Sequence, residues 1–428
     1  MPSTLPSTYP PDLTASEGER LVEVVKDWAA AHGLSVRPPP TVVSAETDPV
    51  GILSTAVPVT LFPSPFPQVC YDQGKVVQKA YNELYAAISQ DEEFLAQIVK
   101  EYLAINEYAL LEQKISQGQL TLPTNLSARG LAAGIRRAFL AYGPSVTPHP
   151  KCVLFLVQDG ERNVFDQRHL EYEVQAPPST IPVFRLPYSQ IKQHTQLAEG
   201  SGRQLLYSPP QLGKHTFEVA VVYMRSGYGP GDYPDASAWD ARYHIERSAA
   251  IKCPSVLTQV AGTKKVQQRT FTNIYPLDSS PAGQKARAIA LDKNQCQSYV
   301  LKPQREGGGN NIYRSAIPGF LKSIPEAHWD AYILMELITP PPVHNTILRL
   351  GKLEHGGVIC ELGIYGTCLW DQREKQGHGI VMNEQSGYLL RTKGDKSEEG
   401  GVAAGFGCMD SCALVGGGHA KNSGERHV

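Results

Sequence analysis

Three consecutive glycines that follow an apolar stretch and a lysine restrict the fold and the chemistry of this chain more than any other feature. The stretch that starts at Ser298 ends at Lys302, Glu306 precedes Gly307–Gly309, and two asparagines come next. An apolar stretch of this length is typical of a buried strand. Glycines lack a Cβ atom, so their backbone N–H groups can approach an anion, while the lysine adds positive charge and the glutamate can bind a divalent cation. The sequence therefore predicts a strand and loop that hold the phosphates and Mg²⁺ of a nucleoside triphosphate.

A plain surface turn is the alternative explanation, since glycine-rich stretches are commonly turns. A turn requires neither a preceding strand of buried type nor a lysine and a glutamate at its flanks. We therefore interpret residues 298–313 as a phosphate-binding segment.

Composition limits the class of protein and of ligand. The chain has 428 residues, of which 41% are hydrophobic and 19% charged, and this length accommodates two or three packed domains. Its net charge of −2 offers no electrostatic basis for binding nucleic acid or an anionic membrane, so we expect small-molecule ligands. No apolar run has the length of a membrane span, and the N-terminal residues lack the pattern of a signal peptide. We expect a cytoplasmic protein.

The eight cysteines are spread thinly over the chain, as is typical of reduced thiols rather than of a disulfide framework. Cys408 and Cys412 are close in sequence, but no second pair and no histidine stands at metal-ligand spacing. We expect these two cysteines to serve packing rather than zinc binding.

The N-terminal part has the pattern of helices separated by proline-rich stretches. Ser16 and Glu19 have the spacing of a capping box, and the apolar residues after them recur on one helical face up to Gly33. Two more amphipathic patterns follow a second proline-rich stretch. The first has a predicted packing face of Val76, Ala80, Tyr81, Leu84 and Tyr85, and the second of Phe94, Leu95, Ile98 and Tyr102. We expect this part to be scaffold.

From Cys152 onward short strands alternate with helices, which predicts an α/β unit. The strands are expected at residues 152–157, 182–186 and 217–224. In such units ligands bind beyond the carboxyl ends of the strands, and residues 161–167 and 225–228 follow two of these strands. Alone, Arg225 would be a solvated loop residue and Asn163 a helix cap. Their joint position favours a binding site.

The C-terminal third contains strands and loops suited to a nucleotide. Residues 331–338 have the pattern of a buried strand that ends at three prolines, which stop sheet pairing. Residues 357–366 form a second apolar strand that contains Glu361, and we expect this carboxylate to be buried and paired. The small residues 400–405 follow the charged stretch 393–399, so they are suited to a loop that closes over a ligand.

Residues 302–311, Lys-Pro-Gln-Arg-Glu-Gly-Gly-Gly-Asn-Asn, resemble the glycine-rich loop of eukaryotic glutathione synthetases, a branch of the ATP-grasp ligases. Further stretches resemble that family in the same order along the chain, namely residues 161–167, 225–228, 261–268, 390–393 and 400–405. The resemblance implies an α/β (α+β) protein with the ATP-grasp fold, an inserted α/β substrate-binding domain and an N-terminal helical part. The implied divisions are an N-terminal helical part at residues 1–145, a substrate-binding domain at 146–255 and a nucleotide-binding and lid region at 256–415. Residues 416–428 are unlike the family's end, and their composition predicts a disordered tail.

The resemblance also implies the residues of the site. Contacts with ATP fall on Lys264, Lys302, Gln304, Arg305, Glu306, Gly307, Gly308, Gly309, Asn310, Asn311, Tyr313, Met335, Glu336, Leu337, Ile338, Glu361, Lys393 and Glu399. Contacts with the peptide substrate fall on Glu161, Arg162, Asn163, Gln167, Arg225, Ser226, Gly227, Tyr228, Arg391, Val402 and Ala403. Ser226 stands where the family usually has an acidic residue. Glu306 is the implied Mg²⁺ ligand, and the family's homodimer is the implied assembly.

The implied reaction joins γ-glutamylcysteine and glycine through an acyl phosphate and gives glutathione, ADP and phosphate. It needs no protein nucleophile, and the chain has neither a Gly-x-Ser-x-Gly elbow nor a convincing Cys/His pair. The expected catalytic work is electrostatic: Lys264, Lys302 and Arg391 offset charge on the reacting groups, together with the amides of the glycine loop. We assign no other catalytic residue.

One stretch of the sequence departs from the family. Between residues 103 and 122 the family carries a further segment, whose two motifs supply a substrate-binding arginine, serines that contact the peptide and two of the three protein ligands of Mg²⁺. Neither motif occurs here, so Glu306 alone can be assigned to the metal.

Two other functions remain open on the sequence. The first is a catalytically impaired, nucleotide-binding member of the same family that lacks part of the metal and substrate site. The second is a dinucleotide-dependent oxidoreductase built on the α/β unit. Against the second, residues 227–231 lack the Gly-x-Gly-x-x-Gly spacing, and no Walker Gly-Lys-Ser/Thr sequence occurs in the chain.

Overall fold

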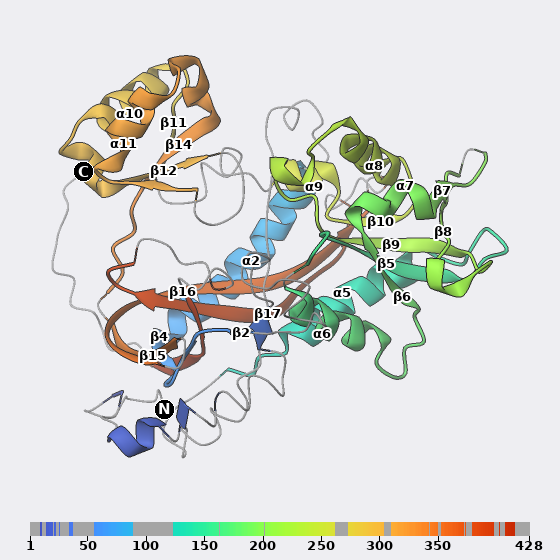
Figure 1. Ribbon diagram of the computed structural model, residues 1–428, viewed down its shortest axis with the longest axis horizontal. Helices are drawn as coiled ribbons and strands as arrows, with labels where there is room; N and C mark the ends of the chain where they lie inside the picture. The colour runs from blue at the N-terminus through green and yellow to red at the C-terminus, as the bar shows by residue number, and fades with distance from the viewer. Residues whose placement is uncertain are drawn as a thin grey trace, which may run out of the picture.

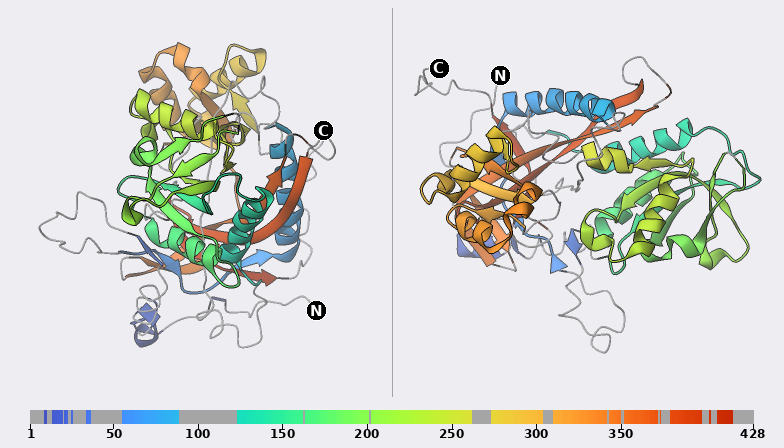
Figure 2. Two further views of the ribbon diagram at one scale, coloured as in Figure 1. Left: turned by 90° about the vertical axis from the view of Figure 1, so that its right-hand side faces the viewer. Right: turned by 90° about the horizontal axis from the view of Figure 1, so that it is seen from above.

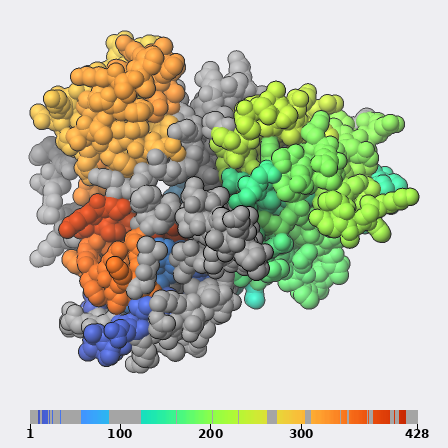
Figure 3. Space-filling model, viewed as in Figure 1, coloured from blue at the N-terminus to red at the C-terminus, as the bar shows by residue number. Residues whose placement is uncertain are grey.

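The computed structural model has a barrel and two separate lobes, one drawn above the barrel in Figure 1 and the other to its right. The two lobes also lie apart in the space-filling view (Figure 3). The structure describes residues 9–10, 14–19, 21–22, 25, 34–36, 55–88, 123–161, 163–200, 202–261, 273–303, 310–341, 343–349, 352–371, 373, 379–397, 402 and 407–415. Within these residues no helix has the length and apolar character needed to cross a membrane. The predicted helix at Phe94–Tyr102 and the tail at 416–428 lie outside the described residues.

The barrel combines strands from both ends of the chain. Its strands close in the order β15-β16-β17-β18-β3. Their bounds are β3 (Val59–Thr60), β15 (Val343–Arg349), β16 (Lys352–Trp370), β17 (Ile380–Gly394) and β18 (Cys408–Asp410). Beside it, β4 (Ser64–Pro67) pairs in parallel with β19 (Cys412–Val415), and a short ladder joins β1 (Ser35–Val36) to β2 (Thr55–Ala56).

The buried carboxylate of Asp410 ties these early and late strands together. It accepts hydrogen bonds from the hydroxyl groups of Thr60, Ser64 and Thr392 at 2.7, 2.5 and 2.5 Å, and from the backbone N–H groups of Ser64 and Ser411. Burial raises the pKa of this carboxyl group, and the surrounding donors oppose that shift. Asp410 is therefore a structural acceptor that joins residues more than 300 positions apart in sequence.

A long ribbon formed by β16 and β17 lies between two helices, α2 (Gln68–Ile88) and α5 (Ser127–Ala141) (Figure 2). Side chains alternate across a strand, so neighbouring residues of β16 meet different helices. Gly366 lies under Gln78 of α2, whereas Thr367 meets Gly134 of α5. The ribbon is thus covered on both faces over this part of its length.

The packing face predicted for the first of the two amphipathic helices is partly wrong. The helix exists as α2, but Val76 is 71% exposed and Ala80 is also exposed, whereas Tyr71, Gln78 and Ala86 are buried. The face that contacts the ribbon contains small and polar residues because Gly366 leaves room for the Gln78 side chain. Apolar spacing alone therefore selected the wrong side of the helix.

The predicted N-terminal capping box is also displaced. The helical turns begin at Ala15, and the reciprocal contacts join Thr14 and Glu17 rather than Ser16 and Glu19. The backbone N–H of Thr14 donates to the Glu17 carboxylate at 3.0 Å, and the Thr14 hydroxyl donates to the same carboxylate at 2.6 Å. Both pairs have the required spacing, so the spacing could not distinguish them.

The α/β lobe contains a six-stranded sheet in the order β6-β5-β9-β8-β7, with β10 also paired to β9. Its strands are β5 (Lys151–Val157), β6 (Val183–Pro187), β7 (Thr195–Leu197), β8 (Leu205–Tyr207), β9 (Phe217–Arg225) and β10 (Ile251–Cys253). Its helices are α6 (Val164–Gln175), α7 (Ile191–His194), α8 (Ala236–Glu246) and α9 (Val256–Ala261), with short 3₁₀ turns at η1 (Tyr188–Gln190), η2 (Pro210–Leu212) and η3 (Pro230–Asp232). Strands β5, β6, β9 and β10 are parallel, which confirms the predicted α/β unit.

The second, smaller lobe contains a four-stranded sheet in the order β11-β14-β12-β13. Its strands are β11 (Ile274–Pro276), β12 (Tyr299–Pro303), β13 (Ile312–Tyr313) and β14 (Tyr332–Glu336). Helices α10 (Pro281–Leu291) and α11 (Ala316–Ser323), with turns η5 (Gln295–Ser298) and η6 (Glu326–Ala331), complete it. The predicted strands before the glycine run and at 331–338 are confirmed as β12 and β14.

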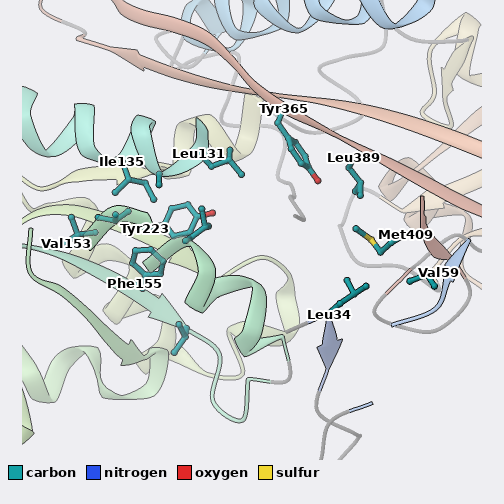
Figure 4. Packing of buried hydrophobic residues seen from close by; sticks show 14 of the residues in the cluster. Leu34, Val59, Leu131, Ile135, Val153, Phe155, Tyr223, Tyr365, Leu389 and Met409 are labelled. Atoms are coloured by element: carbon teal, nitrogen blue, oxygen red, sulfur yellow. The ribbon is translucent and has the colours of Figure 1, made fainter. Parts of the chain in front are cut away.

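One hydrophobic core connects the α/β lobe to the barrel (Figure 4). Phe155 and Tyr223 of the α/β sheet and Leu131 of α5 belong to the same cluster as Tyr365 and Leu389 of the ribbon. The side of the ribbon that carries Tyr365 and Leu389 therefore faces the lobe in which the sequence predicts the peptide site.

Candidate functional site

The carboxyl ends of β5 and β9 lie side by side at one edge of the α/β sheet. Val157, the last residue of β5, pairs in register with Arg225, the last residue of β9. The loops that follow these strands therefore start at adjacent points, and they carry the two stretches predicted to bind the peptide. The structure brings Glu161, Asn163 and Arg225–Tyr228 to the same edge, as the α/β rule predicted.

Arg225 forms a buried ion pair with Asp166 of α6. The guanidinium Nη2 donates to Asp166 Oδ2 at 2.9 Å, and the side chains are 8% and 14% exposed. Burial is the largest influence on the pKa of Arg225 and lowers it, but Asp166, Tyr228 and Tyr223 together raise it by more, so the arginine stays charged. Within the described residues, Arg225 Nε and Asp166 Oδ1 have no hydrogen-bond partner. This pair retains one donor and one acceptor at the carboxyl edge of the sheet.

Glu161 is held by its own loop and by α6. Its carboxylate accepts the backbone N–H of Asn163 at 2.7 Å and the side-chain amide of Gln167 at 2.6 Å. Gln167 is 1% exposed, and its amide oxygen accepts from Arg185 Nη2 at 2.6 Å. Asn163 occupies the N-cap position of α6, but its side chain makes no capping hydrogen bond. Asn163 therefore stands at the N-cap position, as the helix-cap alternative predicts, but its side chain does not cap the helix.

The loop after β9 is tightly organised. Gly227 has φ +78°, and a Cβ atom there would lie 2.8 Å from the Tyr233 hydroxyl, so only glycine fits. Asp232 accepts the backbone N–H groups of Tyr228 and Gly229 at 2.7 and 3.0 Å. Ser226 is buried. The loop therefore presents Tyr228 from a fixed backbone.

In the smaller lobe, Lys302 and Met335 lie on one face of the sheet. Lys302 pairs in register with Ile333, and Val300 pairs with Met335, so these four residues share a face. The opposite face carries Leu301 and Leu334, which pack against the core of α10 and α11. The helices thus cover one face, and the face with the lysine is turned away from them.

Residues 335–338, to which the resemblance assigns contacts with ATP, comprise the end of β14 and the first residues after it. The Glu336 carboxylate is turned to its own lobe, where Asn273 Nδ2 donates to it at 2.8 Å and the Tyr299 hydroxyl at 3.4 Å. The Leu337 backbone N–H donates to the carbonyl of Ser298 at 2.9 Å. Ile338 is 71% exposed, so an apolar side chain stands uncovered where a flat base is expected.

The prediction that Glu361 is a buried carboxylate is wrong. Its side chain is 42% exposed, and its carboxylate pairs with the Arg391 guanidinium at 2.7 Å. The two residues lie directly opposite each other on β16 and β17. Alternation places Glu361, Arg391 and Lys393 on the same side of the ribbon as Tyr365 and Leu389, which is the side toward the α/β lobe. Val402 packs against this same cluster.

Several predicted site residues lie outside the described residues: Arg162, Lys264, Gln304, Arg305, Glu306, Gly307, Gly308, Gly309, Glu399 and Ala403. The described residues nearest the glycine run are Asn310, Asn311 and Tyr313, and Asn311 Nδ2 donates to the Tyr313 hydroxyl at 3.1 Å. Within the part of the chain that the structure covers, no group of three or more His, Cys, Asp and Glu side chains forms a metal site. All eight cysteines are free thiols, and Cys408 and Cys412 are buried, as expected for packing.

Sequence reasoning missed Asp166, Arg185 and Asp232. Asp166 and Asp232 lie within or next to the predicted stretches, at three and four residues from Asn163 and Tyr228. Their negative charge next to a predicted binding loop could have identified both as partners of the site residues. Arg185 had no such signal, because only the pairing of β6 with β5 brings it to α6.

Comparison with protein families gives one match that spans almost the whole chain. The model of the eukaryotic glutathione synthase ATP-binding domain matches residues 15–111 and 104–414. The chain belongs to the eukaryotic glutathione synthetase family. The two matched segments meet at residues 104–111, within the stretch where the family's additional segment is missing from the sequence.

Relatives within the glutathione synthetase family cover nearly the full chain. The glutathione synthetase large chain of Schizosaccharomyces pombe is 33% identical over 506 aligned positions, which cover 94% of this chain and 98% of the relative. The glutathione synthetases of Rattus norvegicus and Homo sapiens are each 32% identical, over 92% of this chain and 96% of the relative. Because 506 exceeds the 428 residues present, the alignment includes positions at which this chain has no residue.

The fold is also similar to a solved structure. The apo form of a glutathione synthetase-like effector from Globodera pallida superposes with a TM-score of 0.66 at 19% identity, covering 94% of this chain and 98% of that chain. The predicted α/β class with the ATP-grasp fold of the glutathione synthetase family is therefore confirmed.

Proposed function

We propose that this chain is a glutathione synthetase, which uses ATP to join γ-glutamylcysteine and glycine and releases glutathione, ADP and phosphate. One observation carries the proposal: family relatives with this activity in their names match more than nine-tenths of the chain and of themselves. They favour the synthetase over the impaired relative and over the oxidoreductase.

A carboxylate is a poor acyl donor, so its ligation to an amine in water requires activation. ATP supplies the phosphoryl group that converts the carboxylate into an acyl phosphate, which the amine of glycine can attack. The protein then has to position the two reactants and offset negative charge, and it needs no nucleophile of its own. This requirement matches a site built from arginine, lysine and backbone groups.

The peptide is proposed to bind at the carboxyl edge of the α/β sheet. Arg225, held by Asp166, would supply a permanent positive charge that attracts a peptide carboxylate. Tyr228 and Ser226 belong to the same loop, and Glu161 and Asn163 belong to the neighbouring loop after β5. Arg162 is proposed to contribute to the same site. Arg391 of the ribbon, and Val402 and Ala403 further along the chain, are also proposed to contact the peptide. Gln167 is proposed to act through Glu161, because it is buried against that carboxylate.

ATP is proposed to lie against the face of the smaller lobe's sheet that carries Lys302 and Met335. The face that carries Lys302 suits a nucleotide, because the lysine can contact phosphate and Met335 supplies an apolar surface on the neighbouring strand. Lys302 pairs with Ile333, and Met335 follows two residues later on the same face of β14. The backbone at 336–338, with the exposed Ile338, would meet the base. Lys264, residues 304–311, Tyr313, Glu361, Lys393 and Glu399 complete the proposed contacts.

Mg²⁺ is proposed to accompany the nucleotide, with Glu306 as its protein ligand. The described residues contain no cluster able to hold the ion independently of the nucleotide. Nucleotide phosphates and water commonly supply most Mg²⁺ ligands in such sites.

We propose further that the chain acts in the cytoplasm as a homodimer, on small molecules and without nucleic acid or membrane as partner. The small net charge of −2 supports the choice of ligand class. The homodimer is supported by the family resemblance, and sedimentation of the purified chain at several concentrations would test it.

The reaction is tested by ADP release from the purified chain with ATP, Mg²⁺ and γ-glutamylcysteine, with and without glycine. We expect glycine-dependent ADP, and we expect mass spectrometry to identify glutathione as the product. ATP binding without glycine-dependent ADP would instead identify the impaired member of the family. The control is the Lys302→Ala variant, in which we expect weaker ATP binding and unchanged folding.

A further inference from the structure

The backbone carbonyl of Gly227 connects the proposed peptide loop to helix α9. Two side chains donate to it: the Tyr233 hydroxyl at 3.1 Å and the Gln259 amide nitrogen at 3.2 Å. Tyr233 follows the loop directly, whereas Gln259 comes from α9, 32 residues further along the chain. Gln259 is 5% exposed, so its amide is committed to the protein interior.

The N-terminal end of α9 is held by a second set of contacts. Glu246 Oε1 accepts the backbone N–H of Val256, the first residue of α9, at 3.1 Å. The same carboxylate oxygen accepts Arg242 Nε at 2.8 Å, and Arg242 Nη1 lies 3.4 Å from the Tyr233 hydroxyl. Arg242 is 3% exposed. The loop, α8 and α9 thus form one closed network of hydrogen bonds.

Helix α9 also contacts the barrel side of the molecule. Val260 and Ala261 are buried in a small cluster with Tyr85 of α2. Helix α2 in turn packs on the ribbon that carries Arg391 and Glu361. Gln259 therefore lies between the loop of the α/β lobe and a helix that rests on the barrel.

We propose that Gln259 is a positioning residue for the peptide substrate. It fixes the Gly227 carbonyl relative to α9 and α2, and thereby sets how Arg225 and Tyr228 face Arg391 across the peptide. The inference rests on the proposed function, because it assigns the loop to γ-glutamylcysteine. It predicts that loss of the Gln259 amide weakens binding of the dipeptide and leaves ATP binding unchanged.

The test is calorimetric titration of γ-glutamylcysteine and, separately, ATP into the purified full chain. Gln259→Leu keeps a similar volume and removes the donor, so we expect a roughly three- to tenfold weaker affinity for the dipeptide, as for the loss of one neutral hydrogen bond. Gln284→Leu is the matched control, since this exposed glutamine donates only to its own helix start. A folded Gln259→Leu protein that binds the dipeptide as tightly as wild type overturns the inference.

Two further variants distinguish positioning from general destabilisation. Gln259→Glu can donate to the Gly227 carbonyl only when protonated, so its dipeptide affinity should recover as pH falls from 8 toward 6, while that of Gln259→Leu should not. Tyr233→Phe removes the second donor, and the double variant should lose more affinity than the two single variants together. A flat pH profile for Gln259→Glu, or simple additivity, would contradict the proposal.

The wild-type titration separates this inference from the proposed function. If wild-type protein binds no γ-glutamylcysteine, the proposed function fails, and the inference fails with it. If wild type binds the dipeptide and Gln259→Leu matches it, only the inference fails.

Discussion

At the scale of single residues, the site depends on buried charges whose partners come from other elements. Arg225 ends β9, whereas its partner Asp166 lies on α6. The sequence identified Arg225 because it follows a strand in a stretch that resembles the family. It could not show that Asp166 would pair with Arg225, because 59 residues separate them and only the parallel pairing of β5 and β9 brings them together.

Removing Asp166 should destabilise the protein and weaken peptide binding. Asp166→Ala leaves Arg225 buried without a counter-charge, which typically costs about 3–5 kcal/mol. Asp166→Asn keeps a hydrogen-bond acceptor, so its loss of stability should be smaller. Urea unfolding measures the change in stability. The control is Glu326→Ala, whose exposed pair with Arg287 should contribute only about 0–1 kcal/mol. Equal losses of stability in Asp166→Ala and Glu326→Ala would show that burial does not make the Asp166–Arg225 pair more important to the fold than an exposed pair.

Glu218 should make stability depend on pH. It is fully buried, and its carboxylate accepts from the Ser145 hydroxyl at 2.7 Å and from the Thr147 backbone and hydroxyl at 3.0 and 2.6 Å. Burial raises the pKa of Glu218, but these hydrogen bonds outweigh burial and the net shift is downward. A folded pKa below the unfolded one gives stability that is present above the unfolded value and is lost as pH falls through the folded value.

The matching experiment compares wild type with Glu218→Gln, which does not titrate. The stability difference in favour of wild type should be largest near pH 7 and should shrink once the pH falls below about 4.3, the ordinary glutamate pKa. Urea unfolding at a series of pH values gives this difference. A difference that stays constant between pH 7 and pH 3 would show that the Glu218 charge contributes nothing.

At the scale of elements, close packing of helix on sheet decides which residues face the core. Helix α5 approaches the ribbon through two glycines, since a Cβ atom at Gly130 would lie 2.4 Å from the Ser386 carbonyl oxygen and one at Gly134 would lie 2.6 Å from Thr367 Cγ2. The helical periods were readable in the sequence. The buried face of α2 was not, because it includes the polar Gln78 as well as Tyr71, and apolar spacing does not detect a buried glutamine.

Gly130→Ala should therefore destabilise the protein although alanine favours helix. The gain in helix propensity is about 1 kcal/mol, whereas a backbone clash in a packed interface typically costs about 1–3 kcal/mol. Gly319→Ala in α11 is the control, because a Cβ atom there meets nothing within 4 Å. Thermal unfolding should show a lower midpoint for Gly130→Ala and an equal or higher one for Gly319→Ala. A raised midpoint for Gly130→Ala would mean that α5 can move away from the ribbon at little cost.

At the scale of the whole molecule, one core joins the α/β lobe to the barrel, so the two should unfold together. Leu389 of the ribbon and Phe155 of the α/β sheet belong to this cluster and are buried. Leu389→Ala removes buried apolar contacts and should cost about 2–5 kcal/mol. We expect one calorimetric transition that moves down as a unit. Two separate transitions, with only one of them shifted by Leu389→Ala, would show that the lobe folds independently.

The sequence by itself determined the chemistry and the local elements. Glycines after a strand, with Lys302 and Glu306 beside them, predict phosphate binding because these residue types suit an anion and its cation wherever the chain places them. Strand and helix periods likewise follow from local side-chain geometry. Tertiary structure alone decided the pairing of Asp166 with Arg225, the half-exposed Glu361–Arg391 pair and the link from Gln259 to Gly227. These contacts join residues 30 to 59 positions apart, and which of them meet depends on how strands pair and helices pack.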